Sequence, residues 1–138
     1  MKRRIAAAAA ALCLLLAGCG STNGEEPYDA QDVQTLLEAD LFSESLEEVD
    51  SNILYGLYGL DAGLMSSSVA YLSTGATAEE VALFILNDAD DADTVQTACE
   101  KRVADHINAC ESYNPAEVTK LEGAVISVRN NTVLLVVG

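Results

Sequence analysis

The sequence predicts a single α+β domain with helices laid on one face of a mostly antiparallel sheet. Three observations lead to this class: a helical apolar stripe over 92–113, a continuous apolar run at 81–86, and two β-rich runs that close the chain. The 138 residues fit one domain and are too few for a two-lobed receptor. Half of the residues are apolar, which argues against disorder.

The chain begins with the features of an export signal. A basic start at 2–4 precedes the apolar run 5–17, which is shorter than the roughly 20 residues of a transmembrane helix. The run ends in Leu-Ala-Gly-Cys, which looks like a bacterial lipoprotein box with Cys19 as the lipid-bearing residue. We therefore predict a lipoprotein signal peptide at 1–18 and membrane attachment through lipid on Cys19. An ordinary secreted protein cleaved near Ala17 or Gly18, with Cys19 merely nearby, is the alternative.

Removing the signal peptide makes the chain still more acidic. The full chain carries 22 acidic and 7 basic side chains, a formal charge of −15, and without residues 1–18 only four bases remain, giving −18. This excess disfavours nucleic acid and anionic lipid as partners, because both are bound through Lys and Arg. Segment 19–28, which contains Gly, Ser, Asn and Pro without periodicity, predicts a flexible tether before an acidic domain at 29–138.

The first part of the domain predicts one helix and two strands. Apolar residues at helical spacing indicate a helix over 29–42, with Asp29 as its N-terminal cap and Asp32 in its first turn. Residues 53–60 and 67–73 are rich in Val, Ile, Leu and Tyr and predict two strands.

The middle of the chain predicts a buried strand followed by the longest helix. Gly75 marks a turn, and the run 81–86 is typical of a central strand covered on both faces. A helix capped by Thr77 is the alternative for this run. Segment 92–113 has apolar residues at steps of four and three, with acidic residues in its first turn, and predicts the long helix.

The C-terminal part predicts a short helix and a hairpin. Asn-Pro-Ala-Glu at 114–117 supplies a cap, a proline at the first helical position and an acid at the third, for a helix ending at Leu121. Two β-rich runs, 124–129 and 132–137, flank Asn130–Asn131, and asparagine tolerates the positive φ of tight turns.

Several short motifs together resemble one family. They are Tyr58-Gly59-Leu60-Asp61, Gly75 with Ala78-Glu79-Glu80-Val81, Tyr113-Asn114-Pro115 with Glu117, Lys120 and Leu121, and the Asn-Asn hairpin. With the lipoprotein box, they make the chain similar to the small lipoproteins of Gram-positive anaerobes grouped as domain of unknown function 4358. The resemblance covers nearly all of the mature domain and implies an extracytoplasmic α+β module. It implies no activity, ligand or site residue.

The two remaining cysteines, Cys99 and Cys110, fall on the apolar stripe of the long helix. Eleven residues of helix separate them, about 16 Å at 1.5 Å per residue, whereas a disulfide needs Cα atoms within about 7 Å. We predict buried, unpaired thiols that act as small apolar side chains and share no zinc ion. Pairing would require the helix to break near Asp105.

The densest acidic cluster, 87–93, partly matches a calcium-binding EF-hand loop. Asp88 and Asp90 fit its first two alternating positions, but Asp93 replaces the required glycine and Cys99 the bidentate glutamate. We interpret the cluster as a solvated turn before a helix, with calcium binding as the alternative.

Candidate catalytic residues are few. The only histidine, His106, borders the apolar stripe and predicts a helix-boundary residue rather than a general base. The chain has no nucleophile elbow, phosphate loop or zinc-protease motif, so we expect no enzyme, with a paired-carboxylate hydrolase as a minor alternative. Tyr55, Tyr58 and Tyr71 fall on the two predicted strands as edges of the core, or alternatively as an aromatic binding face.

These observations predict a non-enzymatic lipoprotein domain on the extracytoplasmic face of a bacterial membrane. We expect it to act through protein contacts or as an accessory of an envelope complex, with a basic or neutral protein partner. A module that binds a small ligand or a cation is the alternative. We expect no catalytic, cofactor or metal residues.

Overall fold

The computed structural model describes residues 25–138. The predicted signal peptide 1–18 and the lipidation site Cys19 lie outside these residues. Among the described helices, none is long and apolar enough to cross a membrane.

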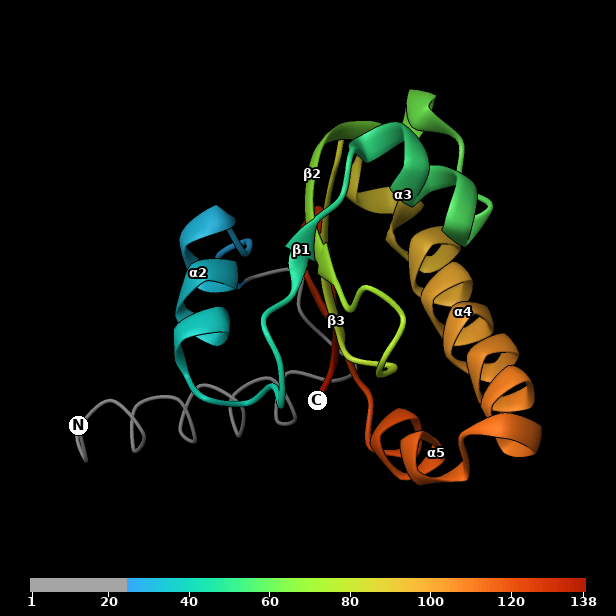
Figure 1. The fold of residues 1–138 in the computed structure, drawn as a ribbon. Helices are drawn as coiled ribbons and strands as arrows, with labels where there is room; N and C mark the ends of the chain where they lie inside the picture. Colours follow the sequence, from blue (N-terminus) through green and yellow to red (C-terminus); the bar gives the residue numbers. More distant parts are fainter. Residues whose placement is uncertain (1–24) are drawn as a thin grey trace.

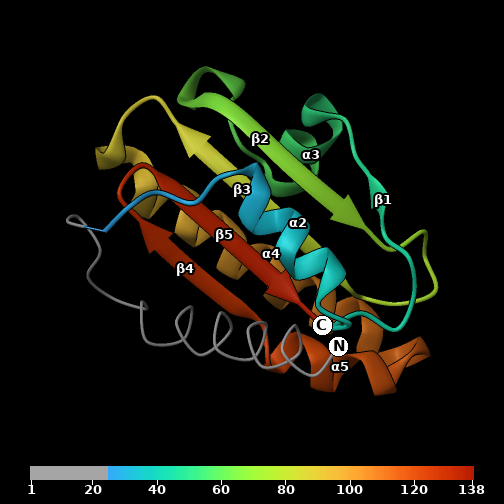
Figure 2. The ribbon, with the colours of Figure 1, turned by 90° about the vertical axis from the view of Figure 1, so that its left-hand side faces the viewer.

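The described residues form four α-helices and a five-stranded antiparallel sheet with the strand order β1-β2-β3-β5-β4 (Figures 1 and 2). This confirms the predicted α+β class. The elements, in chain order, are α2 (Ala30–Glu38), β1 (Glu47–Glu48), α3 (Ser51–Tyr58), β2 (Met65–Leu72), β3 (Glu80–Leu86), α4 (Ala92–Tyr113), α5 (Pro115–Glu122), β4 (Val125–Arg129) and β5 (Thr132–Val137).

Helices cover both faces of the sheet, so the prediction that they lie on one face is wrong. Helix α2 lies on one side, whereas α3 and α4 lie on the other, with α5 beyond the end of α4 (Figure 1). The reason lies in β3 and β5, whose residues are almost all buried and therefore need cover on both faces. Two separate hydrophobic clusters result, one on each face.

Several predicted elements are confirmed. Helix α4 has the predicted bounds, and the run 81–86 lies in strand β3, so the helical alternative for this run is wrong. Strands β4 and β5 pair as a hairpin in which Asn130 takes a φ of +52°, and Gly75 takes a φ of +120°. Helix α5 begins with proline as predicted, but Asn114 makes no side-chain cap hydrogen bond.

Two predictions near the start of the domain need correction. Helix α2 has the predicted Asp29 cap but ends at Glu38 rather than Phe42, because Asp40 takes a left-handed φ of +60°. The strand predicted at 53–60 is wrong, since these residues belong to helix α3. Asp50 caps that helix through the amide of Asn52, and Gly59 ends it at a φ of +66°.

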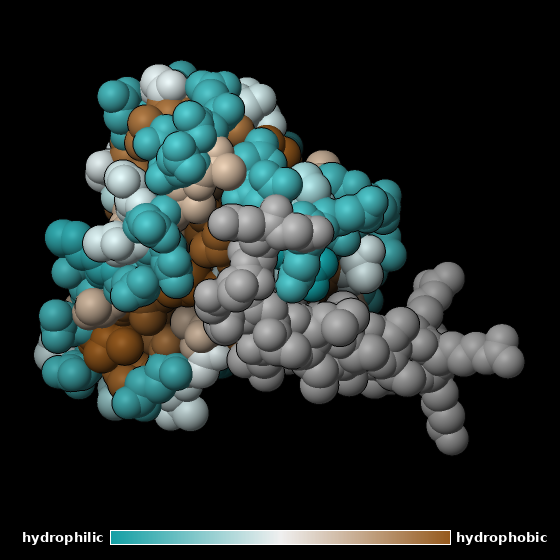
Figure 3. Space-filling view, turned by 180° about the vertical axis from the view of Figure 1, so that it is seen from behind, coloured by the Kyte–Doolittle hydropathy of each residue, from teal (hydrophilic) through white to brown (hydrophobic). Residues whose placement is uncertain are grey.

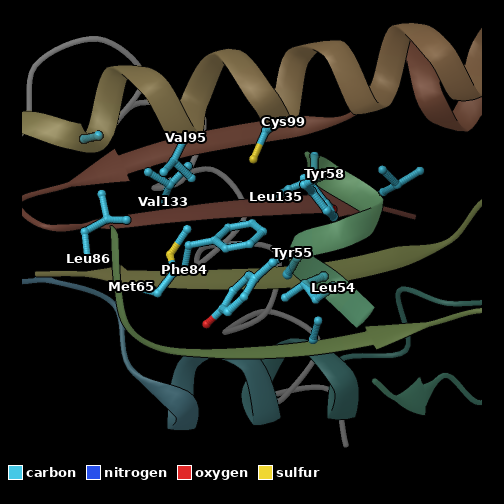
Figure 4. Packing of buried hydrophobic residues seen from close by; sticks show 14 of the residues in the cluster. Leu54, Tyr55, Tyr58, Met65, Phe84, Leu86, Val95, Cys99, Val133 and Leu135 are labelled. Carbon is cyan, nitrogen blue, oxygen red and sulfur yellow. The ribbon is translucent and has the colours of Figure 1, made fainter. Parts of the chain in front are cut away.

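The larger hydrophobic cluster fills the space between the sheet and helices α3 and α4. Tyr58 and Phe84 meet edge to face with ring centroids 5.0 Å apart. Figure 4 shows Val95 and Cys99 of α4 and Leu54 and Tyr58 of α3 packed among Phe84, Val133 and Leu135 of the strands. Helices α3 and α4 therefore cover this face of the sheet with apolar side chains.

The packed part of the chain begins before residue 29. Tyr28, assigned by sequence to the tether 19–28, is buried against the smaller cluster. Its amide donates to Thr132 and its hydroxyl is 2.7 Å from the Ser127 hydroxyl. Arg129 stacks on the Tyr28 ring. Tyr28 thus attaches the start of the domain to the β4–β5 hairpin.

Candidate functional site

The three tyrosines predicted to cluster do not form one surface. Tyr55 and Tyr58 lie on α3 and are buried in the larger cluster, whereas Tyr71 lies on β2 beside the smaller cluster, on the opposite face of the sheet. The aromatic binding face proposed as the alternative is therefore wrong. The error follows from reading α3 as a strand, which placed the three tyrosines on two neighbouring strands.

The acidic turn 87–93 leads into α4, as the sequence predicted. Asp88 accepts a hydrogen bond from the Asp90 amide at 2.9 Å and so caps the short turn before the helix. Among residues 25–138, no group of three His, Cys, Asp or Glu side chains is placed to hold a metal ion.

Both cysteines behave as predicted. Cys99 and Cys110 are buried and free on the continuous helix α4. Burial, helped by the nearby carboxylate of Glu80, raises the pKa of the Cys99 thiol far above its ordinary value. The thiol therefore stays protonated and packs as an apolar group.

Three buried glutamates form the feature that sequence reasoning missed. Glu79, Glu80 and Glu117 expose only 2%, 2% and 7% of their surface. Glutamate is rarely buried without a partner, because removing its charge from water is costly. Hydrogen bonds and ion pairs within the domain hold these three buried carboxylates.

Glu80 is held on the side of α3 and α4. It accepts a hydrogen bond from the Tyr58 hydroxyl at 2.5 Å and another from Nη2 of Arg102 at 3.1 Å. Burial and the charge of Glu80 raise the pKa of Tyr58 well above its ordinary value, so the phenol keeps its proton and donates.

His106 lies at the margin of this group, half-buried as a helix-boundary residue. Its Nδ1 is 4.0 Å from Glu80 and makes no hydrogen bond. Burial and the positive charge of Arg102 lower the pKa of His106, and these effects outweigh the attraction of Glu80 and Glu117. The imidazole is therefore neutral at neutral pH, and the contact is not a charged pair.

Glu79 is held by Ser43 of the loop after α2 and by Lys120 of α5. It accepts from Nζ of Lys120 at 2.9 Å, and from the amide and hydroxyl of Ser43 at 2.9 and 2.8 Å. Burial alone would raise the pKa of Glu79, but the hydrogen bonds from Lys120 and Ser43 outweigh it and lower the pKa. Glu79 is therefore a stable anion that fixes the loop at Ser43.

Glu117 completes this ionic group. It accepts from the amide of Ala78 at 2.7 Å and lies 3.2 Å from Nζ of Lys120. Burial would lower the pKa of Lys120, but its hydrogen bonds to Glu79 and Glu117 raise it. Lys120 thus ties α5 to Glu79, and Glu79 in turn holds the loop at Ser43.

The loop held by Glu79 forms one wall of a groove of about 750 Å³. A second attachment fixes the same loop, because the Ser73 hydroxyl donates to Glu44 at 2.6 Å. Gln34 of α2 donates to the Tyr71 hydroxyl at 3.1 Å. The groove is lined by Leu37, Glu38, Ala39, Asp40, Phe42, Ser43, Glu44, Ser45, Leu46 and Tyr71.

The groove combines apolar surface with negative charge. Leu37, Phe42, Leu46 and Tyr71 are the large apolar side chains among its lining residues, and Glu38, Asp40 and Glu44 are the acids. None of the described residues that line it is Lys, Arg or His. The arrangement suits an apolar ligand that carries positive charge.

Comparison with known proteins identifies a family and no relative of established function. The family described as "Domain of unknown function (DUF4358)" matches residues 39–138. No curated protein and no solved structure matches the chain. The match includes the groove loop and all three buried glutamates. The match spans most of the chain, which therefore belongs to the domain of unknown function 4358 family.

Proposed function

We propose that this protein is a lipid-anchored, extracytoplasmic domain that acts by binding a basic partner protein and catalyses no reaction. The anchor is the lipid that Cys19 would carry after cleavage of residues 1–18. Such a domain would work near the bacterial membrane as an interaction or accessory module of the cell envelope.

The observation that carries the proposal is that every basic residue in the described part of the chain is paired with an acid of the same domain. Lys and Arg there number four, against 22 acids. Each of the four forms an ion pair within the domain: Lys101 with Asp105, Arg102 with Glu80, Lys120 with Glu79 and Glu117, and Arg129 with Glu25.

The remaining carboxylates therefore produce a strongly negative field around the domain. Figure 3 shows one face of the molecule, where hydrophilic side chains surround apolar patches. A field of one sign attracts oppositely charged proteins and accelerates their association, and salt screens it. A basic partner follows from this charge.

Fractionation of cells that produce the full chain tests the anchor. Wild-type protein is expected with the membrane, whereas Cys19→Ala should be lost from that fraction, because a protein without the lipid loses its attachment. Cys13→Ala, within the apolar run of the signal peptide, is the matched control and should behave as wild type. Membrane association of Cys19→Ala equal to that of wild type would contradict the anchor.

Crosslinking in cells, followed by identification of the captured protein, tests the partner. We expect a protein with a basic contact surface, whose complex weakens as salt is raised from about 0.05 to 0.5 M. A partner with an acidic contact surface, or a complex indifferent to salt, would argue against the proposed attraction.

A small-ligand module is the second candidate, and the groove favours it. Its volume of about 750 Å³ lies within the range of roughly 300–1,000 Å³ typical of small-molecule sites. Native mass spectrometry of the purified chain tests this candidate. A small molecule retained by wild type and lost in Ser45→Trp, which places an indole in the groove, would support it. If wild type and variant each show only the mass of the protein without a bound molecule, that result would oppose it.

A further inference from the structure

We infer that the groove between α2, the 39–46 loop and Tyr71 binds a peptide segment of a partner protein in which a bulky apolar side chain stands beside Lys or Arg. The inference rests on the proposed function and gives that function a site and a ligand chemistry.

The apolar part of the ligand follows from the groove lining. Leu37, Phe42 and Leu46 are only partly buried and pack against the smaller hydrophobic cluster. Their exposed surface is continuous with a well-packed core, so a leucine or phenylalanine side chain placed there removes apolar surface from water on both partners.

The charged part follows from the acids. Glu38, Asp40 and Glu44 contribute three carboxylates to the groove, and its lining contains no basic side chain among the described residues. The complement is a cation that can reach past the apolar contact, as Lys and Arg do with their long side chains. A second copy of this chain is a poor occupant, because its own described bases are already paired.

The walls of the groove are fixed before any ligand arrives. Ser43 is held by the buried Glu79, and Glu44 accepts from Ser73. On the other wall, the Tyr71 hydroxyl accepts a hydrogen bond from Gln34 of α2. A ligand that enters therefore spends little free energy on ordering the loop.

The test uses a fluorescein-labelled peptide, Gly-Lys-Leu-Phe-Arg-Gly, and the full chain held in phosphatidylcholine nanodiscs. Fluorescence anisotropy gives the Kd. The groove variant Glu38→Gln/Asp40→Asn/Glu44→Gln removes three charges while keeping side-chain size and the acceptor for Ser73. The matched control Glu100→Gln/Glu111→Gln/Glu122→Gln removes three exposed charges from α4 and α5, on the other side of the sheet.

We expect the groove variant to weaken binding by about tenfold or more, and the control variant by less than about threefold. Ser45→Trp, which fills the groove, should abolish binding, whereas Ser112→Trp on the exposed surface of α4 should not. Peptides with Glu in place of Lys and Arg, or Ser in place of Leu and Phe, should bind at least about tenfold more weakly.

The alternative results separate the site from the function. Equal weakening by both triple variants, with no effect of Ser45→Trp, would overturn the groove but leave an acidic binding domain. Equal binding of the Ser-substituted peptide would overturn the apolar anchor and reduce the site to a charged surface. Binding of the Glu-substituted peptide as tight as that of the basic peptide would overturn both the groove inference and the proposed function.

Discussion

Two adjacent residues, Glu79 and Glu80, show how the two faces of the sheet differ. Both are buried carboxylates: Glu80 is the first residue of β3, and Glu79 immediately precedes it. Glu80 is held by Tyr58 and Arg102, which lie on the helices α3 and α4. Glu79 is held by Lys120 of α5 and by Ser43 in a loop.

The same chemistry therefore serves two purposes. On the α4 face, a 22-residue helix covers the sheet, and the ion pair joins elements that are already packed. On the α2 face, a nine-residue helix leaves a groove beside the loop, and Ser43 of that loop donates hydrogen bonds to Glu79, the partner of Lys120. We infer that Glu80 chiefly supports stability and Glu79 chiefly supports the shape of the site.

The largest expected effect is on the α4 face. Arg102→Ala leaves Glu80 buried without its cation, which should lower the free energy of unfolding by about 3 kcal/mol. Lys101→Ala is the matched control. It removes only an exposed pair with Asp105, worth about 0.5 kcal/mol or less. Urea unfolding compares the two, and equal losses would contradict the role given to Glu80.

The next effect separates the faces. Lys120→Met leaves Glu79 and Glu117 without their shared cation and should cost about 2 kcal/mol, less than a fully buried pair because Lys120 is partly exposed. Hydrogen exchange should also accelerate at the Ser43 amide. Arg102→Ala serves as the comparison, under conditions in which both variants are equally stable. It should not accelerate exchange of the Ser43 amide more than that of other amides. The reverse pattern would refute the assignment of Glu79 to the loop.

Acid should lower the stability of the protein through protonation of Glu79. The folded state lowers the pKa of Glu79 from its ordinary 4.5. Its contribution to stability is therefore complete above pH 4.5 and is lost as the pH falls through the lowered value. Lys120→Met should move this loss to higher pH, which urea unfolding at a series of pH values measures. If stability is lost at the same pH in the variant as in wild type, Lys120 does not set the pKa of Glu79.

A smaller effect is expected at the groove wall. Tyr71→Phe removes the hydroxyl that accepts from Gln34 and should cost about 1 kcal/mol or less. It keeps the apolar ring, so binding of the basic peptide should change by less than about threefold. Loss of peptide binding would show that the hydroxyl itself contacts the ligand.

The smallest effect concerns His106 on the α4 face. Its folded pKa lies below the ordinary 6.5, so the unfolded chain binds the proton more readily. Stability should therefore decline as the pH falls from 6.5 toward the lowered value. His106→Gln should flatten the profile in this window and leave the acid limb of Glu79 unchanged. A steeper decline in the variant would contradict the neutral imidazole.

Much of the fold was predictable because it depends on local pattern. Helix α4 has a long apolar stripe, β3 has an unbroken apolar run, and the β4–β5 hairpin has its asparagine turn. Helix α3 was missed because eight residues rich in Tyr, Leu and Ile satisfy strand propensity as well. Asp50 before it and Gly59 after it, a cap at each end, were the signals that could have identified it.

The candidate site was much harder to predict. Charged residues are ordinarily read as surface, and the partners of Glu79 lie 36 and 41 residues away along the chain. The motif Ala78-Glu79-Glu80-Val81 supported the family resemblance, but nothing local indicated that both acids are buried. The groove lies where a loop, the end of α2 and Tyr71 come together in the fold. Contacts between segments far apart in the chain leave no periodic pattern of apolar residues in the sequence.

Mapping the bound peptide by nuclear magnetic resonance tests the central claim most directly. Amide shifts of the full chain in nanodiscs would be followed as the basic peptide is added. Our account predicts that the shifts concentrate at residues 37–46 and at Tyr71, and that the exposed amides of α4 stay unchanged. Shifts concentrated on α4, or spread evenly over the acidic surface, would contradict it.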